Sequence, residues 1–212
     1  MSLTNKLHQN SSGTNVSLTN INFLVEGFYN EDEWALTNLN DHLTLSRHSI
    51  EIQRNSHSDD HEYIWIDTCC IDKSSSAKLS EAINSMYRYY RKIKVCYAYL
   101  LDVRSDLHSR SFNMNFRMCK WFTRGWTLQE LIVPTTVLFY TKDWNKIGTK
   151  ASMQETISEI TGIPSKVLLS QDDPSDSSIA ARMSWAAGRE TTCIEDRAYL
   201  LMVRSVGKPA SV

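Results

Sequence analysis

Few folds accommodate the stretch Tyr63–Ile71, YIWIDTCCI, which is apolar, β-branched or aromatic at nearly every position. A strand that is apolar on both faces is typical of the middle of a parallel sheet, because other elements must cover both faces. Two further stretches, Val95–Leu101 and Thr136–Tyr140, have the same character. We therefore predict that these three strands run parallel in one sheet.

An amphipathic helix is predicted between the first two of these strands. Its apolar residues recur at helical spacing, and most charged residues lie off that stripe. The apolar positions are Leu79, Ile83, Met86, Tyr87 and Tyr90. Strand, helix and strand within about forty residues form a βαβ unit, which is expected to be right-handed and parallel.

The remaining segments complete a single α/β domain. Ile21–Val25 is a weak strand candidate, and Asp106–Asn115 is expected to be a polar loop. Helices are expected at four places: Trp126–Val133, ended by Pro134; around Met153–Ile160, ended by Gly162; Ser178–Ala187; and Cys193–Ser205, opened by a capping box of Thr192 and Glu195. The fold class is α/β, with a mostly parallel sheet of about four or five strands flanked by helices and a helical C-terminal third.

Length and charge limit the classes of protein. The 212 residues suit one domain, which we place at residues 21–212, after a tail at residues 1–20 that is expected to be disordered and, through about Ser17, to contribute nothing to the core. Lys and Arg number 23 against 24 Asp and Glu, so binding to nucleic acid through bulk positive charge is not expected. No run approaches the ~18 apolar residues of a membrane helix. We expect a cytoplasmic protein without a secretory signal or a membrane span.

The five cysteines indicate a reduced setting rather than a disulfide framework or a zinc site. Their number is odd, no CxxC occurs, and no Cys/His spacing suits zinc. No metal site is therefore expected. Cys69 and Cys70 are adjacent, and neighbours on a strand point to opposite faces, so at least one of them belongs to the core. A nucleophilic cysteine would need a nearby base, and a buried structural thiol is the favoured interpretation.

Ligands of open parallel sheets bind beyond the carboxyl ends of the strands. That rule selects Asp67–Asp72, Asp102 and Asp143–Trp144. A carboxylate at Asp67, inside an apolar strand, costs free energy unless it is paired. Asp67 either caps the following helix or pairs with Lys73, which is the favoured interpretation, or it serves a ligand or catalytic role.

The stretch Phe122–Ile132, FTRGWTLQELI, contains the strongest candidate site residues. Glu130 has the spacing of a capping-box partner of Thr127. The alternative is a nucleotide pocket, in which Arg124 binds phosphate, the rings of Trp121 and Trp126 stack on a base and the Glu130 carboxylate binds ribose hydroxyls. Spacing alone favours the capping box.

A second charged group lies further along the chain. We predict that it forms an ion-pair network on helix ends. Its members are Arg182, Arg189, Arg197, Glu190, Glu195 and Asp196.

Five sequence blocks, in this order, resemble the fungal heterokaryon incompatibility (HET) domain family. They are YIWIDTCCIDKSSSAKLSEAINSMYRYYRKIKVCYAYLLDV, WFTRGWTLQELIVP, VLFYTKDWNKIGTK, ITGI, and MSWAAGRETT followed by ED and AYLL, and together they cover about Tyr63 to Leu201. The resemblance implies a cytosolic fungal protein of non-self recognition, a form of innate immunity, whose activation triggers regulated cell death.

HET domains are thought to be remote relatives of TIR domains, which implies a TIR-like, flavodoxin-like sheet. Some TIR domains cleave NAD with one glutamate on a helix, and Trp126–Leu131 looks like the plant TIR segment Trp-Cys-x-x-Glu-Leu. The resemblance thus implies Glu130 as the catalytic candidate. It implies no cofactor, with NAD as the candidate substrate. The substrate-binding candidates are Asp67, Cys69, Asp102, Arg124 and Trp126.

The chain also departs from the family pattern. Phe23–Asn30 lacks the usual Ser-x-x-Trp-Gly motif, Cys193 replaces a common arginine, and the usual continuation after Gly207 is missing. We interpret the chain as a divergent, C-terminally shortened member. Three functions stay open: a death-signalling module that self-associates or binds partner domains, an NAD glycohydrolase, and an inactive decoy paralogue. An enzyme requires an accessible Glu130 that faces the strand ends.

Overall fold

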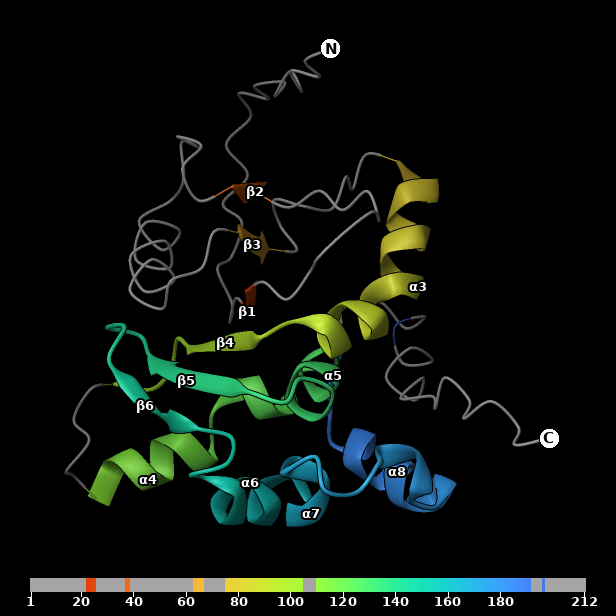
Figure 1. The fold of residues 1–212 in the computed structure, drawn as a ribbon. Helices are drawn as coiled ribbons and strands as arrows, with labels where there is room; N and C mark the ends of the chain where they lie inside the picture. The colour runs from red at the N-terminus through yellow and green to blue at the C-terminus, as the bar shows by residue number, and fades with distance from the viewer. Residues whose placement is uncertain are drawn as a thin grey trace.

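The structure is a computed structural model that describes residues 22–25, 37–38, 63–66, 75–104, 110–191 and 196. The predicted tail at residues 1–20 and the predicted helix Cys193–Ser205, apart from Asp196, lie outside the described residues. Figure 1 shows the arrangement of the elements. They are β1 (Asn22–Val25), β2 (Thr37–Asn38), β3 (Tyr63–Ile66), α3 (Ser76–Lys92), β4 (Val95–Leu100), α4 (Arg110–Arg117), η1 (Lys120–Thr123), α5 (Thr127–Ile132), β5 (Val137–Thr141), β6 (Lys146–Thr149), α6 (Gln154–Thr161), α7 (Ser165–Leu168), η2 (Pro174–Asp176) and α8 (Ile179–Ala187).

The described strands form one mixed sheet in the order β2-β3-β1-β4-β5-β6. β4 pairs with β5 in parallel, and the other four pairings are antiparallel. Helices α4 to α8 lie on one side of β4, β5 and β6, and α3 leads into β4 at one end of that strand (Figure 1). The chain is therefore an α/β protein, as predicted.

The prediction of a mostly parallel sheet is wrong. The three predicted strands do run in the same direction, since β3 and β4 are each antiparallel to β1 and β4 is parallel to β5. However, β1 inserts between β3 and β4, so the predicted βαβ pair is not adjacent. Six strands are described rather than four or five, because β2 and β6 were not recognised. Apolar periodicity predicts that a segment is a buried strand, but it does not identify the neighbouring strand.

The predicted amphipathic helix is confirmed as α3. Its N-cap is Ser75, whose side chain accepts a hydrogen bond from the Lys78 amide at 3.4 Å. Arg91 and Lys92 occupy the last turn, where the helix dipole favours positive charge. Met86 and Tyr90 are the buried residues of this helix, so the apolar stripe carries its packing.

The predicted loop Asp106–Asn115 is wrong from Arg110 onward, where α4 begins. Two aromatic residues one turn apart, Phe112 and Phe116, lie on this helix, and their ring centroids are 6.4 Å apart. Phe116 is buried and meets Phe122 and Phe139 edge-on. Packing of this aromatic face therefore outweighs the polar composition of the segment.

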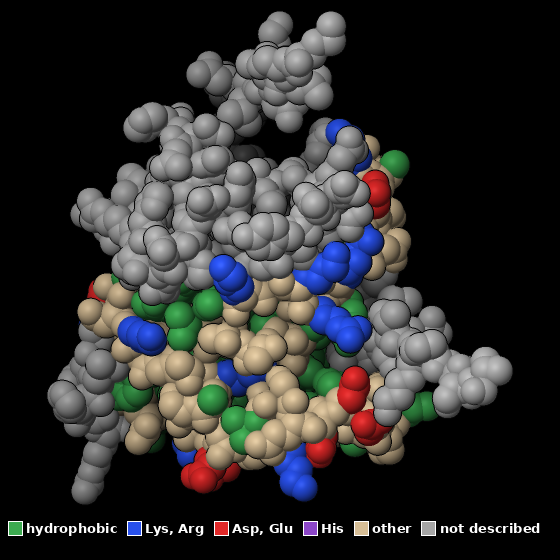
Figure 2. Space-filling model, viewed as in Figure 1, with side chains coloured by type: hydrophobic (Ala, Val, Ile, Leu, Met, Phe, Trp, Pro, Cys, Tyr) green, Lys and Arg blue, Asp and Glu red, His purple; other side chains and the backbone are tan. Residues whose placement is uncertain are grey.

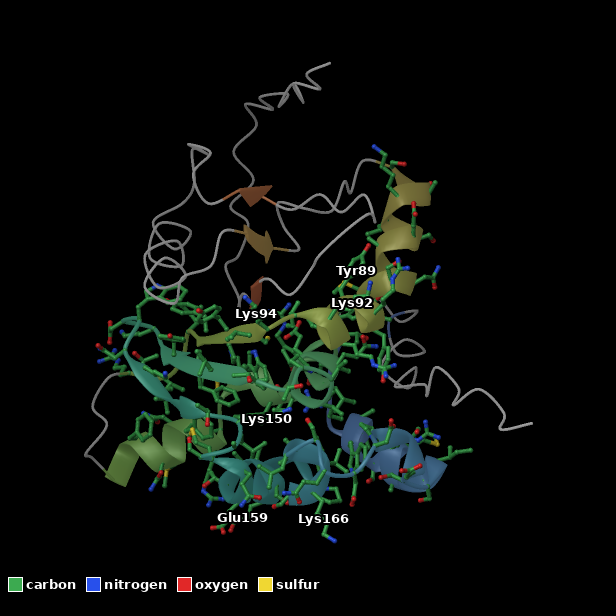
Figure 3. The ribbon with its side chains drawn as sticks, viewed as in Figure 1. Tyr89, Lys92, Lys94, Lys150, Glu159 and Lys166 are labelled. Carbon is green, nitrogen blue, oxygen red and sulfur yellow. The ribbon has the colours of Figure 1, made fainter. Side chains whose placement is uncertain are left out.

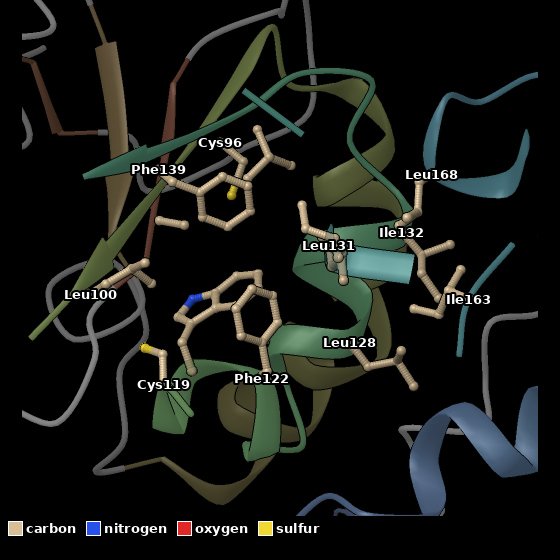
Figure 4. Close-up of a cluster of buried hydrophobic side chains, with 14 of the residues drawn as sticks. Cys96, Leu100, Cys119, Phe122, Leu128, Leu131, Ile132, Phe139, Ile163 and Leu168 are labelled. Atoms are coloured by element: carbon tan, nitrogen blue, oxygen red, sulfur yellow. The ribbon is translucent and has the colours of Figure 1, made fainter. Parts of the chain in front are cut away.

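The hydrophobic core fills the space between the sheet and the helices on one side of it. Alternate residues of β4 and β5 face this core, as the period of two in a strand requires. Figure 4 shows Phe122, Leu131 and Phe139 pointing toward one another between the strands and α5. The sheet residues of this cluster are Cys96, Ala98, Leu100, Val137 and Phe139.

The surface carries charged side chains of both signs. On the face shown in Figure 2, hydrophobic side chains occur between charged and polar ones. Among the described residues, the large hydrophobic side chains that are exposed are Leu101, Met114, Met118, Ile179 and Met183. No helix among the described residues is both long and apolar enough to cross a membrane.

Gly162→Ala is expected to lower the free energy of unfolding by about 1 kcal/mol, because Gly162 ends α6 with φ = 70°, where L-residues are strained. Gly188→Ala is the matched control. Gly188 ends α8 with φ = −89°, and an added Cβ would meet no atom within 4 Å. Urea unfolding measures both variants. Equal stabilities of the two variants would contradict the proposed strain at Gly162.

Candidate functional site

The candidate catalytic residue, Glu130, lies on the short helix α5, and every residue of that helix is buried. Glu130 is 5% exposed. Its Oε1 accepts a hydrogen bond of 3.0 Å from the Tyr90 hydroxyl, near the end of α3. A carboxylate at this depth is stable only with partners of this kind. α5 follows the aromatic segment η1 and ends before Pro134, as the sequence predicts.

Thr127 does not form the capping box that its spacing suggests. α5 has no side-chain hydrogen bond at its N-cap. The Thr127 hydroxyl lies 2.5 Å from the Trp121 carbonyl oxygen and 2.8 Å from the Arg124 carbonyl oxygen, and these two acceptors share its one hydrogen. It also accepts a hydrogen bond from Arg189 Nη1 at 2.8 Å. The Thr127 hydroxyl is therefore occupied by carbonyls of the preceding segment and by Arg189 instead of a local cap.

Arg189 is a buried arginine that joins three segments. It is 3% exposed and follows directly after the end of α8. Its Nε donates to the Trp185 carbonyl at 3.1 Å, and its Nη1 donates to the Arg124 carbonyl at 2.9 Å in addition to Thr127. Its Nη2 is buried without a hydrogen-bond partner. Burial lowers the pKa of Arg189 to about 10, and the nearby charge of Glu130 acts in the opposite direction.

Two distant sequence blocks meet at this place. The Glu190 amide donates to the Thr123 carbonyl at 2.7 Å, and the Gly125 amide donates to the Glu190 carbonyl at 2.8 Å. Arg124 and Glu190 accordingly form a parallel bridge. We call the contacts of Arg189 and Glu190 with residues 123–127 the clamp. It holds the chain in front of α5 in a fixed position.

The indole of Trp126 extends this contact region. Trp126 is half-buried, and its Nε1 donates to Asp196 Oδ2 at 3.1 Å.

The predicted ion-pair network on helix ends is wrong for Arg189, because its hydrogen bonds go to two carbonyls and a hydroxyl. Arg197 and Glu195 lie outside the described residues.

The C-terminal end of α5 is held by a lysine from the loop after β6. Lys150 is 1% exposed, and its Nζ donates to the Leu131 carbonyl at 3.1 Å and to the Pro134 carbonyl at 2.5 Å. Figure 3 places Lys150 inside the molecule, whereas Glu159 and Lys166 lie on its outer edge. Burial lowers the pKa of Lys150 to about 8. An ammonium at the carbonyl end of a helix is stabilised by the helix dipole.

Cys96 lies in β4 and is completely buried. Burial raises the pKa of its thiol well above the usual range, and the charge of Glu130 adds to that effect. The Cys96 thiol is therefore protonated at neutral pH and behaves as a core residue. No group of three or more His, Cys, Asp or Glu side chains among the described residues is placed to hold a metal ion.

Asp102 lies at the other end of β4 from Glu130. Tyr90 precedes this six-residue strand and Cys96 is its second residue, and both are close to Glu130, whereas Asp102 lies two residues after Leu100, the last residue of the strand. Such a strand is about 20 Å long. Both carboxylate oxygens of Asp102 accept hydrogen bonds, from Cys119 Sγ at 2.7 Å and from the Lys120 amide at 2.8 Å.

The structure thus brings together only some of the predicted site residues. Arg124 and Trp126 lie at the start of the helix that carries Glu130, whereas Asp102 follows the opposite end of β4 and binds Cys119 and Lys120. The strand-end rule fails for Glu130, because the carboxylate lies near the amino end of β4. Asp67 and Cys69 lie outside the described residues.

The sequence does not indicate Tyr90 and Lys150 as partners of α5. Tyr90 was recognised only as a core residue of the α3 stripe, which gives no indication of its hydroxyl partner. Lys150 follows a short strand and has no local pattern that distinguishes it from a surface lysine. Both assignments depend on contacts across 16 to 40 residues of sequence.

Comparison with known proteins identifies the family. A family model described as heterokaryon incompatibility protein (HET) matches residues 30–115. The vegetative incompatibility protein HET-E-1 of Podospora anserina is 49% identical over 148 residues, which are 68% of this chain. The chain belongs to the heterokaryon incompatibility family. This HET chain spans 11% of the length of that relative. No solved structure matches the HET chain.

Proposed function

We propose that this HET domain acts in heterokaryon incompatibility, as a cytoplasmic signalling module of non-self recognition whose activation leads to regulated cell death. One observation carries the proposal, the 49% identity to a vegetative incompatibility protein over 68% of the chain. In this proposal the module works by self-association or by binding other death-signalling proteins.

A second candidate is cleavage of NAD by Glu130 within the same pathway. Glu130 lacks the accessibility and the strand-end position expected of an enzyme, and what supports this candidate is a carboxylate held by the Tyr90 hydroxyl, with the Arg189 guanidinium close enough to act on its charge. Perturbed charged groups held in fixed positions are frequent at functional sites. A carboxylate in this environment stabilises positive charge that develops on a ribose ring.

The proposed reaction balances without a cofactor. The bond between ribose C1′ and the nicotinamide nitrogen breaks, and its electron pair leaves with the nitrogen, which gives neutral nicotinamide. Water attacks C1′ and loses a proton, which gives ADP-ribose. Glu130 stabilises the oxocarbenium-like charge or binds the ribose hydroxyls. Since Glu130 is only 5% exposed, this candidate requires its neighbours to move before the ribose can enter.

Glu130→Gln tests both candidates in one experiment. The chain is expressed from an inducible promoter in a filamentous fungus, colony viability is measured, and nicotinamide release is followed with purified protein at several concentrations. We expect induction of the wild-type chain to kill cells. If Glu130 is catalytic, the Gln variant loses killing and nicotinamide release by about 100-fold or more, because its amide keeps the shape but lacks the charge.

The controls separate the outcomes. Met118→Ala changes an exposed side chain away from α5 and is expected to kill like the wild type. Undiminished killing by Glu130→Gln contradicts the catalytic candidate and favours the association module. Normal growth with abundant, folded wild-type protein contradicts the signalling proposal and points to a decoy paralogue.

A further inference from the structure

We propose that Arg189 is a positioning residue for Glu130, which acts by fixing the start of α5 through the clamp. The proposal rests on the functional role of Glu130 proposed above. It concerns a residue that is proposed to touch no substrate, that donates hydrogen bonds to the start of the helix that carries Glu130, and whose charge lies near the Glu130 carboxylate.

The geometry of the guanidinium supports this role. Arg189 binds the Trp185 carbonyl at the end of α8, the Arg124 carbonyl before α5, and the Thr127 hydroxyl on α5. Thr127 and Glu130 are three residues apart and therefore lie on the same face of the helix. The hydrogen bond from Arg189 to Thr127 consequently fixes the position and the rotation of the helical turn that bears the Glu130 carboxylate.

The shape of the side chain is essential to these contacts. A planar guanidinium presents its N–H groups in a rigid fork, whereas a lysine ammonium is a compact charge with rotatable donors. A lysine at position 189 could keep the charge but could not reach the ends of two helices and a loop carbonyl with fixed angles. Arg189→Lys therefore separates positioning from charge.

The unsatisfied Nη2 indicates that stability alone does not explain Arg189. Leaving a buried donor without a partner costs about 1–3 kcal/mol, and well-packed apolar residues often replace buried charges without loss. The charge is placed where it interacts with Glu130.

The test compares Arg189→Lys and Arg189→Met with the wild-type chain. Killing and nicotinamide release are measured beside the melting temperature and the NMR signal of the Trp126 indole N–H, which reports the contact with Asp196. We expect both variants to lose function by about 10- to 100-fold, the cost of a misplaced catalytic group, and to shift the indole signal. Arg189→Met is further expected to move the pH profile of any nicotinamide release, whereas Arg189→Lys leaves that profile in place.

Variants of Thr127 keep the test valid if the Arg189 variants do not fold. Thr127→Ser retains the hydroxyl and is expected to preserve function, whereas Thr127→Ala removes the anchor and is expected to lose it. Arg117→Met removes an exposed arginine that pairs with Glu159 and is the matched control, with function and indole signal unchanged.

Each result decides the proposal. Loss of function in folded Arg189→Lys and Thr127→Ala, together with loss in Glu130→Gln, supports it. Full function in folded Arg189→Lys overturns it. If Glu130→Gln retains function while Arg189→Lys loses it, Arg189 acts independently of Glu130 and the proposal fails. If Glu130→Gln and Arg189→Lys both retain function, the catalytic candidate and the positioning role fail together. An unchanged signal of the Trp126 indole in folded Arg189→Lys would show that the clamp does not depend on Arg189 and would contradict the proposal.

Discussion

Trp121→Ala is expected to lower the free energy of unfolding by about 3–5 kcal/mol, because it leaves a cavity in a fully buried site. Trp121 is 0% exposed and meets Phe122 and Phe139 edge-on, with ring centroids 5.2 and 5.5 Å away. Its carbonyl also lies within reach of the Thr127 hydroxyl. A loss of this size is a large fraction of the roughly 5–15 kcal/mol by which folded proteins are stable.

Urea unfolding followed by circular dichroism measures this loss. Met118→Ala is the control, since Met118 lies three residues earlier and is exposed. Substitutions at such a site usually change stability by less than about 0.5 kcal/mol. A loss below about 1 kcal/mol in Trp121→Ala would contradict the central position of this indole in the core.

The pH dependence of stability is expected to reveal Lys150. Burial lowers its pKa in the folded protein from the ordinary value of 10.5 to about 8. Below pH 8 both states bind the proton. Between about pH 8 and pH 10.5 the unfolded state binds more protons, so the free energy of unfolding increases with pH, by up to about 3 kcal/mol in all.

Lys150→Met isolates this contribution, because other groups that titrate in the same range remain. The stability of the wild type minus that of the variant is expected to rise across this interval, as measured by urea unfolding at several pH values. Lys166→Met removes an exposed lysine and is expected to leave no such difference. A flat wild-type-minus-Lys150→Met difference would mean that Lys150 is hydrated in solution.

These predictions converge on α5, a six-residue helix that could not persist alone in water. Its polar residues are buried and held from outside: Thr127 by Arg189, Glu130 by Tyr90, and the last carbonyls by Lys150. Local propensity contributes little to such a helix. The surrounding elements keep it in one position, which is a requirement for any site that uses Glu130.

The candidate site shows how far spacing can be interpreted. The sequence indicated Glu130 and placed Arg124 and Trp126 beside it, and adjacency along the chain was sufficient for that. It also selected Asp102 from the rule for strand ends, whereas the structure uses both Asp102 oxygens to bind Cys119 and Lys120. Asp102 and Glu130 therefore lie near opposite ends of β4, since α5 packs near the amino end of that strand.

Local patterns alone determined which segments became the main elements. The apolar runs became β3, β4 and β5, the amphipathic stripe became α3, and Gly162 ended α6, because periodicity, capping and glycine conformation act within a few residues. Only the tertiary structure decided that β1 separates β3 from β4, that Arg189 binds Thr127, and that Lys150 holds the end of α5. These pairings join residues far apart in sequence, and their free energy comes from burial of the whole core, which no local pattern encodes.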